Sequence, residues 1–225
     1  MEQKISANRK KDIIKIINSI SGKYSAYEVF TDWIRCCALA ISNSCQLIHN
    51  KVWQEREQNY IDTMKKYSLE ERRMFVKMFH MLTETLDCEM TDVLGQIYME
   101  SGMGSKAAGQ FFTPYHVSKL CAVMSEPELD ENEKCIMNEP SCGGGGMIIA
   151  AASVLKERGI NYQKCMEVVA QDLDWKGVYM CYLQLSLLGI KAVCVQGDTL
   201  MQPYTPGKTE PRHILRTPAK MGVIL

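Results

Sequence analysis

No apolar run in this 225-residue sequence is long enough to span a membrane, and the polar, basic N-terminal segment precedes no apolar stretch of the signal-peptide kind. The chain also lacks an excess of either charge, because Lys+Arg and Asp+Glu both total 26. Proteins that grip nucleic acid unaided usually carry a basic excess, since neutralising phosphates drives their affinity. We therefore expect a cytoplasmic protein without tight DNA binding of its own, although a subunit could obtain that grip from a partner.

Metal-binding patterns are missing as well. The ten cysteines form no CxxC pair and no Cys/His spacing typical of zinc, and His80 and His116 have no partner at a ligand spacing. Cysteine packs as a small apolar side chain, and disulfides are rare in reducing compartments. We interpret the cysteines as buried, reduced thiols and expect no metal site.

The patterns that the sequence does contain divide it into two halves. Residues 1–104 place apolar side chains at three- and four-residue steps, which is typical of helices. Within them, Ser68 followed by Glu71 forms a capping-box pattern that marks a helix start. Residues 101–105, rich in glycine and serine, form the expected link. We predict a helical N-terminal domain over 1–104 and a second domain over 105–225.

The second half alternates short apolar runs with helical patterns. Strands are predicted between helices, at residues 135–137, 166–170, 192–195 and 213–216. Thr113 and Pro114 are expected to open the first helix as N-cap and first-turn proline. This βαβαβ order favours a parallel, doubly wound sheet. The predicted fold class is therefore α/β, with a parallel sheet of about four strands behind a helical N-terminal domain.

A glycine-rich turn, residues 142–146, connects the first of these strands to the following helix. Glycine allows positive φ and close approach to a ligand, and such a turn commonly faces the ligand at the carboxyl edge of a sheet. The turn has neither the GxGxxG of dinucleotide sites nor the Gly-Lys-Ser/Thr ending of a P-loop. Glu139 just before it disfavours a pyrophosphate and suits a ligand with a cationic amino group. Tight packing alone is the other interpretation of the turn.

Acidic residues follow the next two strands. Asp172 stands where an acid commonly accepts hydrogen bonds from ribose hydroxyls, whereas Asp174 is more typical of a helix N-cap. Asp198, after the third strand, could accept a hydrogen bond from an exocyclic adenine amine or belong to an ordinary Gly-Asp turn. In combination these segments are more specific than any one of them alone.

Four segments occur in order: Gly109-Gln110-Phe111-Phe112-Thr113-Pro114, Glu139-Pro140-Ser141-Cys142-Gly143-Gly144-Gly145, Gln171-Asp172-Leu173-Asp174 and Gly197-Asp198-Thr199-Leu200. They resemble, respectively, the GQ(F/Y)(F/Y)TP, DPACGTG, QDxD and GD(T/S)L segments of the adenine-N6 DNA methyltransferases. The likeness is greatest to the modification subunits of type I restriction–modification systems and covers roughly residues 90–220.

The resemblance implies a Rossmann-like core that binds S-adenosyl-L-methionine. The methionine end of this cofactor would be held by Phe112, Thr113, Glu139, Pro140, Ser141, Cys142, Gly143 and Gly145. Asp172 would bind the ribose, and Leu173 would pack on the adenine. Asp198 would bind the adenine, and Thr199 and Leu200 of the same segment are further candidate cofactor-binding residues.

The acceptor side departs from the family pattern. Adenine-N6 transfer uses a fourth motif, (N/D/S)PP(Y/F/W), which holds the target amine in line with the methyl group and stacks on the flipped-out base. The corresponding place holds Thr217-Pro218-Ala219-Lys220, so Thr217 and Pro218 are the candidate catalytic residues. Gln202-Pro203-Tyr204 comes too soon after Asp198 and is interpreted as a loop.

The resemblance leaves three functions open. The first is a DNA adenine-N6 methyltransferase of restriction–modification type that binds DNA through partners, such as a specificity subunit or a second copy of itself. The second is a catalytically silent protein that binds S-adenosylmethionine and acts as a regulator, decoy or assembly subunit of phage or mobile-element origin. The third is methyl transfer to RNA or protein.

Overall fold

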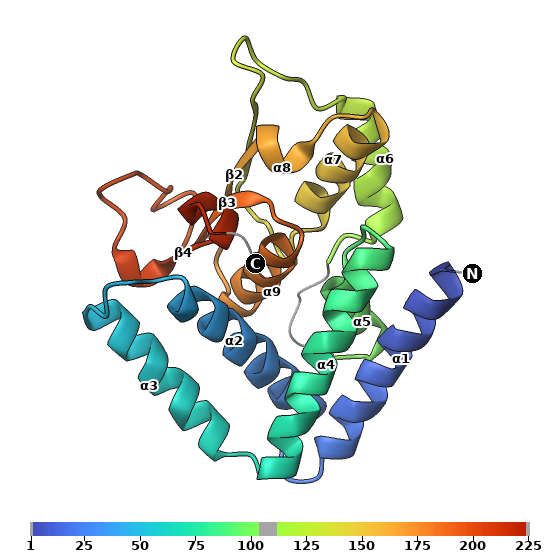
Figure 1. Cartoon of the computed structure of the whole chain (residues 1–225), viewed down its shortest axis with the longest axis vertical. Helices are drawn as coiled ribbons and strands as arrows, with labels where there is room; N and C mark the ends of the chain where they lie inside the picture. Colours follow the sequence, from blue (N-terminus) through green and yellow to red (C-terminus); the bar gives the residue numbers. More distant parts are fainter. Residues whose placement is uncertain (1, 104–111, 224–225) are drawn as a thin grey trace.

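The computed structural model describes residues 2–103 and 112–223, and Figure 1 shows a helical lower part below a sheet with its own helices. The lower part contains α1 (Glu2–Ile20), α2 (Ala26–Ser44), α3 (Lys51–Lys65), α4 (Leu69–Cys88) and α5 (Val93–Glu100). Helix α1 packs along α4, and α2 packs against α3. None of the described helices is long and apolar enough to cross a membrane.

A reciprocal capping box starts two of these helices. The Ser68 side chain accepts from the Glu71 N–H at 3.3 Å, and the Glu71 carboxylate accepts from the Ser68 N–H at 2.6 Å. This confirms the capping box expected from the sequence. Ser25 and Glu28 form the same reciprocal pair at the start of α2. Each box satisfies two N–H groups that a helix start leaves without partners.

The upper part is an α/β arrangement, as predicted. It contains α6 (Tyr115–Ser125), β1 (Cys135–Glu139), α7 (Gly146–Glu157), α8 (Tyr162–Cys165), β2 (Met166–Asp172), α9 (Trp175–Leu187), β3 (Lys191–Gln196), η1 (Pro211–His213), β4 (Ile214–Arg216) and η2 (Pro218–Met221). The strand order is β1-β2-β3-β4, and β1, β2 and β3 are parallel. Pro114, without a side-chain hydrogen bond, is the N-cap of α6, so the N-cap role predicted for Thr113 was wrong.

The fourth strand corrects the prediction of a wholly parallel sheet. β4 pairs antiparallel with β3, with Ile214 opposite Val195 and Arg216 opposite Val193. A parallel strand needs a crossover to the far edge of the sheet, usually through a helix. Here the chain stays at the carboxyl edge of β3, where His213 Nδ1 lies 2.7 Å from Gln196 Oε1. β4 therefore starts at that edge and runs back along β3.

This reversal carries Thr217 and Pro218 to the opposite edge of the sheet. The Thr217 hydroxyl accepts from the Ala192 N–H at 2.9 Å and donates to the Ile190 carbonyl at 2.7 Å, both beside the amino end of β3. Asp172, in contrast, pairs in register with Gln196 at the carboxyl end of β3. The expectation that Thr217 and Pro218 occupy the acceptor position is thereby corrected, and their part is to pack the sheet edge.

The prediction of a doubly wound sheet, in which helices cover both faces, also needs correction. Val168 and Ala170 of β2 face the main apolar core together with α7 and α9, whereas Val193 and Val195 of β3 join a small cluster on the other face. The crossovers β1-α7-β2 and β2-α9-β3 step in the same direction across the sheet, so both helices reach the same face. On the other face Ile136 is 76% exposed.

One apolar core extends through both halves of the chain. It joins residues of α2 and α5, such as Phe30 and Tyr98, with residues of α9 and of the sheet. Helix α9 packs against α2 and α5 on one side and against β2 and β3 on the other. The predicted boundary at residue 104 lies outside the described residues.

Thr217→Val provides a test of the corrected edge. The variant keeps the shape of the side chain but leaves the buried Ala192 N–H without its acceptor, which costs about 1–3 kcal/mol. We expect urea denaturation to show an unfolding free energy lowered by that amount. Thr217→Ser, which keeps the hydroxyl, is the matched control and should lose much less. Equal losses in both variants would contradict the hydrogen bonds described.

Candidate functional site

The turn after β1 is shaped by glycine. Gly143 and Gly145 have φ of +49° and +90°, which are left-handed conformations that other residues rarely adopt. The Cys142 N–H donates to the Gln171 carbonyl at 2.9 Å, so the turn is tied to the end of β2. Helix α7 then starts at Gly146 with no side-chain cap. Backbone N–H groups of the first helical turn therefore border the site.

Asp172 ties the turn to the next strand. Its carboxylate accepts from the Gly143 N–H at 2.8 Å through one oxygen and from the Asp174 N–H at 2.9 Å through the other. A Cβ on Gly177 would lie 3.2 Å from the Asp172 carboxyl carbon, so glycine leaves room for this carboxylate. Each carboxylate oxygen has further acceptor capacity, and two adjacent hydroxyls are a matching donor set.

A cavity of about 280 Å³ lies in front of the turn. Of the predicted site residues, the cavity lining brings together Phe112, Thr113, Ser141, Cys142, Gly143 and Asp172. A neighbouring cavity of about 430 Å³ shares Phe112 and Thr113 with it. Phe112 is buried and meets the Tyr98 ring edge-on at 5.2 Å, which fixes it in front of Gly143. The preceding Gly109, Gln110 and Phe111 lie outside the described residues.

The remaining predicted residues are not part of the lining of this cavity. The Thr199 hydroxyl donates to the Pro140 carbonyl at 2.6 Å, which joins the loop after β3 to the glycine turn. Asp198 accepts from the N–H groups of Leu200 and Met201 at 2.9 and 3.1 Å, as in an ordinary Gly-Asp turn. Leu200 is 92% exposed.

Two further predicted residues stand at the ends of β1 and β2. Glu139 accepts from the Ser141 N–H at 3.2 Å, so its carboxylate faces the start of the turn. Leu173 is 68% exposed next to Asp172. Asp174 caps α9 by accepting from the Lys176 N–H at 3.0 Å, which confirms its interpretation as an N-cap.

Asp92 is a site residue that the sequence analysis missed. It caps α5, is buried, and accepts from the Gly95 N–H and the Gln184 amide, both at 2.8 Å. Its oxygens lie 3.2 Å from where a Cβ on Gly144 or Gly146 would stand. Burial raises the pKa of Asp92, against the lowering effect of its two hydrogen bonds. The sequence signal for Asp92 was an Asp before an apolar helical segment, since Asp is favoured at helix N-caps.

Ser118 is the second missed residue. It is fully buried on α6 and lines the cavity, and its hydroxyl has no hydrogen-bond partner among the described residues. A buried hydroxyl without a partner is unfavourable, so this group favours a polar ligand atom in the cavity. Nothing in the spacing of the sequence marks Ser118, because its place depends on how α6 packs against α7.

The charge of the cavity limits what it can hold. The described lining contains Asp92 and Asp172 but no lysine or arginine. Such a lining disfavours a phosphate and suits a neutral or cationic ligand that offers hydroxyl and amino donors. A nucleoside with an amino-acid tail has this donor set.

The model of one protein family, described as N-6 DNA methylase, matches residues 89–219. The chain belongs to the N-6 DNA methylase family. No curated protein matches the sequence. The family region begins at Glu89, so it includes Asp92 and α5 as well as the sheet. The region that matches the family model therefore contains the glycine turn, Asp172 and the capped α5.

Gly143→Ala tests the shape of the turn. A Cβ at this position would lie 2.8 Å from the Phe112 ring and must also accept a φ of +49°. Gly159→Ala is the matched control, since Gly159 has a φ of +76° with nothing within 4 Å of the added Cβ. We expect about 1 kcal/mol of lost stability for the control and clearly more for Gly143→Ala in urea denaturation. Equal losses would contradict the close packing of Phe112 on the turn.

Asp92→Asn tests the buried carboxyl through pH. Because burial raises the folded pKa above the usual 3.8, the folded state holds the proton more tightly than the unfolded state. The stability from this group is thus present below pH 3.8 and lost as pH rises through the folded pKa. We expect wild type to lose up to about 1.4 kcal/mol per pH unit relative to Asp92→Asn in that window. A pH-independent difference would contradict the raised pKa.

Proposed function

We propose that the chain binds S-adenosylmethionine in the cavity before the glycine turn, as the cofactor-binding part of a DNA adenine-N6 methyltransferase. The observation that carries this proposal is the pairing of the Gly143 N–H with Asp172 in a cavity whose described lining has no cationic side chain. Family membership supports the cofactor, since N-6 DNA methylation draws its methyl group from a sulfonium donor. The bound cofactor would supply an activated methyl group.

Named residues fit the parts of this ligand. Asp172 would accept hydrogen bonds from the ribose hydroxyls with the lone pairs that Gly143 and Asp174 leave available. Ser118 and the buried Asp92 would face the polar tail, and Phe112 with Thr113 would cover it. Leu173 and Leu200, both exposed beside the carboxyl edge, would pack against the adenine.

The residues in the place of the acceptor motif support a second function, in which the chain binds the cofactor but does not transfer the methyl group by itself. The sequence contains no pair of adjacent prolines, and Thr217 is bonded to the amino end of β3, away from the cavity. Thr217, the residue in the place of the acceptor motif, would thus not hold a target amine beside Asp172. A methyl transfer to adenine would need acceptor groups from another polypeptide segment, such as a specificity subunit or a second copy. Without them the chain would act as a silent cofactor-binding regulator, decoy or assembly protein.

Calorimetry and methyl transfer separate these functions. Asp172→Asn should weaken binding of S-adenosylmethionine about 10- to 100-fold, because a charged acceptor is lost. Asp174→Asn is the control, since asparagine also caps α9. Transfer of labelled methyl to adenine-containing DNA should be absent for the chain alone and require an added partner. Equal cofactor affinity in wild type and Asp172→Asn would contradict the proposed site, and transfer by the chain alone would contradict its missing acceptor side.

A further inference from the structure

A second cavity, of about 320 Å³, lies between α2, α3 and the start of α9, apart from the residues of the proposed cofactor site. We call it the basic cleft, after the cations in its lining: Arg35, Arg56, Lys176 and Arg212. Glu55 and Asp174 are the acids that line it. The function proposed above makes no use of this cleft.

Arg56 is the least balanced charge in the cleft. It is 8% exposed, and its guanidinium donates to the Ser42 hydroxyl at 3.0 Å and to the Ile214 carbonyl at 2.6 Å. Both acceptors are neutral, and within residues 2–103 and 112–223 no carboxylate forms an ion pair with Arg56. Burial lowers its pKa, but arginine remains protonated in proteins. A buried cation with only neutral partners is costly, so the cleft favours a bound anion.

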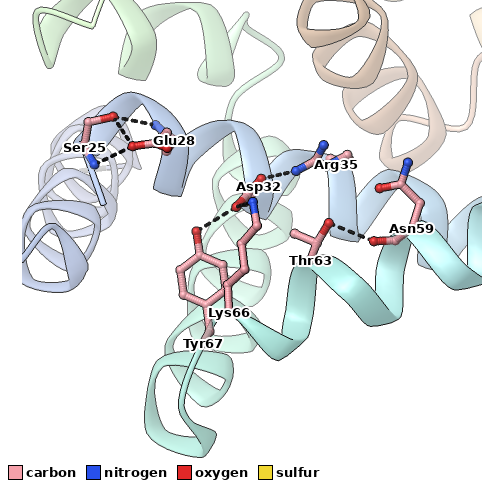
Figure 2. Close-up of polar contacts among 8 residues, drawn as sticks. All are labelled: Ser25, Glu28, Asp32, Arg35, Asn59, Thr63, Lys66 and Tyr67. Carbon is pink, nitrogen blue, oxygen red and sulfur yellow. Dashed lines mark hydrogen bonds and ion pairs between the residues drawn. The ribbon is translucent and has the colours of Figure 1, made fainter. Parts of the chain in front are cut away.

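Arg35 and Thr31 add donors without acceptors. The Arg35 Nε and the Thr31 hydroxyl are buried and make no hydrogen bond to any part of the chain that the structure describes. Arg35 does pair with Asp32, but that single carboxylate also binds Lys66 at 3.1 Å and accepts from Tyr67 at 2.9 Å (Figure 2). One negative charge is thus shared by two cations.

The carboxylates around the cleft are already engaged. Asp174 lies 3.5 Å from Lys176, which also donates to the Tyr98 hydroxyl at 3.0 Å. Glu210 pairs with Arg212 at 2.7 Å. Glu55, the last acid of the lining, lies 3.9 Å from Lys51. An anion entering the cleft would therefore meet Arg56, which has only neutral partners among the described residues, and Arg35, which shares its one carboxylate partner with Lys66.

Some residues that line the cleft follow directly on the carboxyl end of β2, close to the proposed cofactor site. Trp175, three residues after Asp172, stacks on Tyr179 at 5.0 Å and on His213 at 6.3 Å, and it lines the cleft with Tyr179. His213 contacts Gln196 at the carboxyl end of β3. The basic cleft is therefore lined in part by residues that lie two and three positions after Asp172.

We propose that the basic cleft binds a backbone phosphate of DNA. The forked guanidinium groups of Arg35 and Arg56 match the geometry of phosphate oxygens, and aromatic side chains beside cations are typical of nucleic-acid surfaces. The inference rests on the proposed function in one respect only, the choice of DNA as the source of the phosphate.

The test uses variants that leave Arg56 in place, because Arg56 also holds α3 to β4. Arg35→Gln and Arg212→Gln should each lower the affinity for a labelled DNA duplex about three- to tenfold, measured by fluorescence anisotropy, equally for different sequences. Each should also reduce the slope of log affinity against log salt by about 1. Lys65→Gln, on the exposed part of α3 and outside the cleft, is the charge-matched control and should leave both quantities unchanged.

Tryptophan fluorescence identifies the occupant. Inorganic phosphate should change the emission of wild type, and Trp175→Phe should remove that change. If phosphate acts on Trp175 but both glutamine variants bind DNA as wild type does, the cleft holds a small phosphate compound and the DNA contact is overturned. The variants could instead weaken binding of poly-glutamate and leave duplex binding unchanged. That result would assign an acidic protein partner to the cleft and would also overturn the DNA contact. If wild type does not bind the duplex at low salt, the DNA contact is overturned as well.

Calorimetry of S-adenosylmethionine keeps this result separate from the proposed function. Arg35→Gln and Arg212→Gln should bind the cofactor as wild type does, since neither residue lines the cavity before the glycine turn. Loss of duplex binding with normal cofactor binding supports the basic cleft. Cofactor binding that fails in wild type, alongside a phosphate response at Trp175, would overturn the proposed function and leave the cleft standing.

Discussion

The side chain of Gln184 fixes how the two parts of the molecule meet. This amide is fully buried on α9; its oxygen accepts from the Leu94 N–H at 3.0 Å, and its nitrogen donates to Asp92 and to the Gly144 carbonyl, both at 2.8 Å. One residue thus joins the start of α5, the C-terminal half of α9 and the glycine turn. Because each partner is buried, losing any of these bonds would leave a polar group unsatisfied. The shape of the proposed cofactor site depends on this junction.

Features that depend on residues close together in the sequence were predictable from it. The capping box at Ser68, the cap at Asp174 and the first three strands follow from local patterns, and the structure has them at or close to the expected positions. The direction of β4 was not predictable in the same way. A strand of three residues, Ile214 to Arg216, has the same pattern in either direction. Its direction depends on the edge of the sheet to which the segment 197–213 brings the chain. The antiparallel pairing then decided the place of Thr217.

The candidate site likewise contains residues that local patterns predicted and residues that only the packing of the helices brings there. Parallel strands end at one edge, so the order of motifs was enough to bring Gly143 and Asp172 together. Asp92 and Ser118 were missed because their role comes from packing: α5 meets the turn through Gln184, and α6 lies along α7. The basic cleft was missed for a similar reason. A net charge of +0 describes the whole chain, whereas Arg35 and Arg56 meet only through the contact of α2 with α3.

The contacts of the cofactor side explain how it can form without an acceptor motif. Asp172 binds the turn, Thr199 binds Pro140, and Gln171 holds the loop after β3 through the Gln202 carbonyl at 2.9 Å and the Tyr204 N–H at 3.0 Å. These bonds join the ends of β1, β2 and β3 to one another and not to Thr217 or Pro218. A strand carrying acceptor groups is therefore not needed to shape the cavity. Under the proposed function, cofactor binding would therefore not require the acceptor groups that methyl transfer needs.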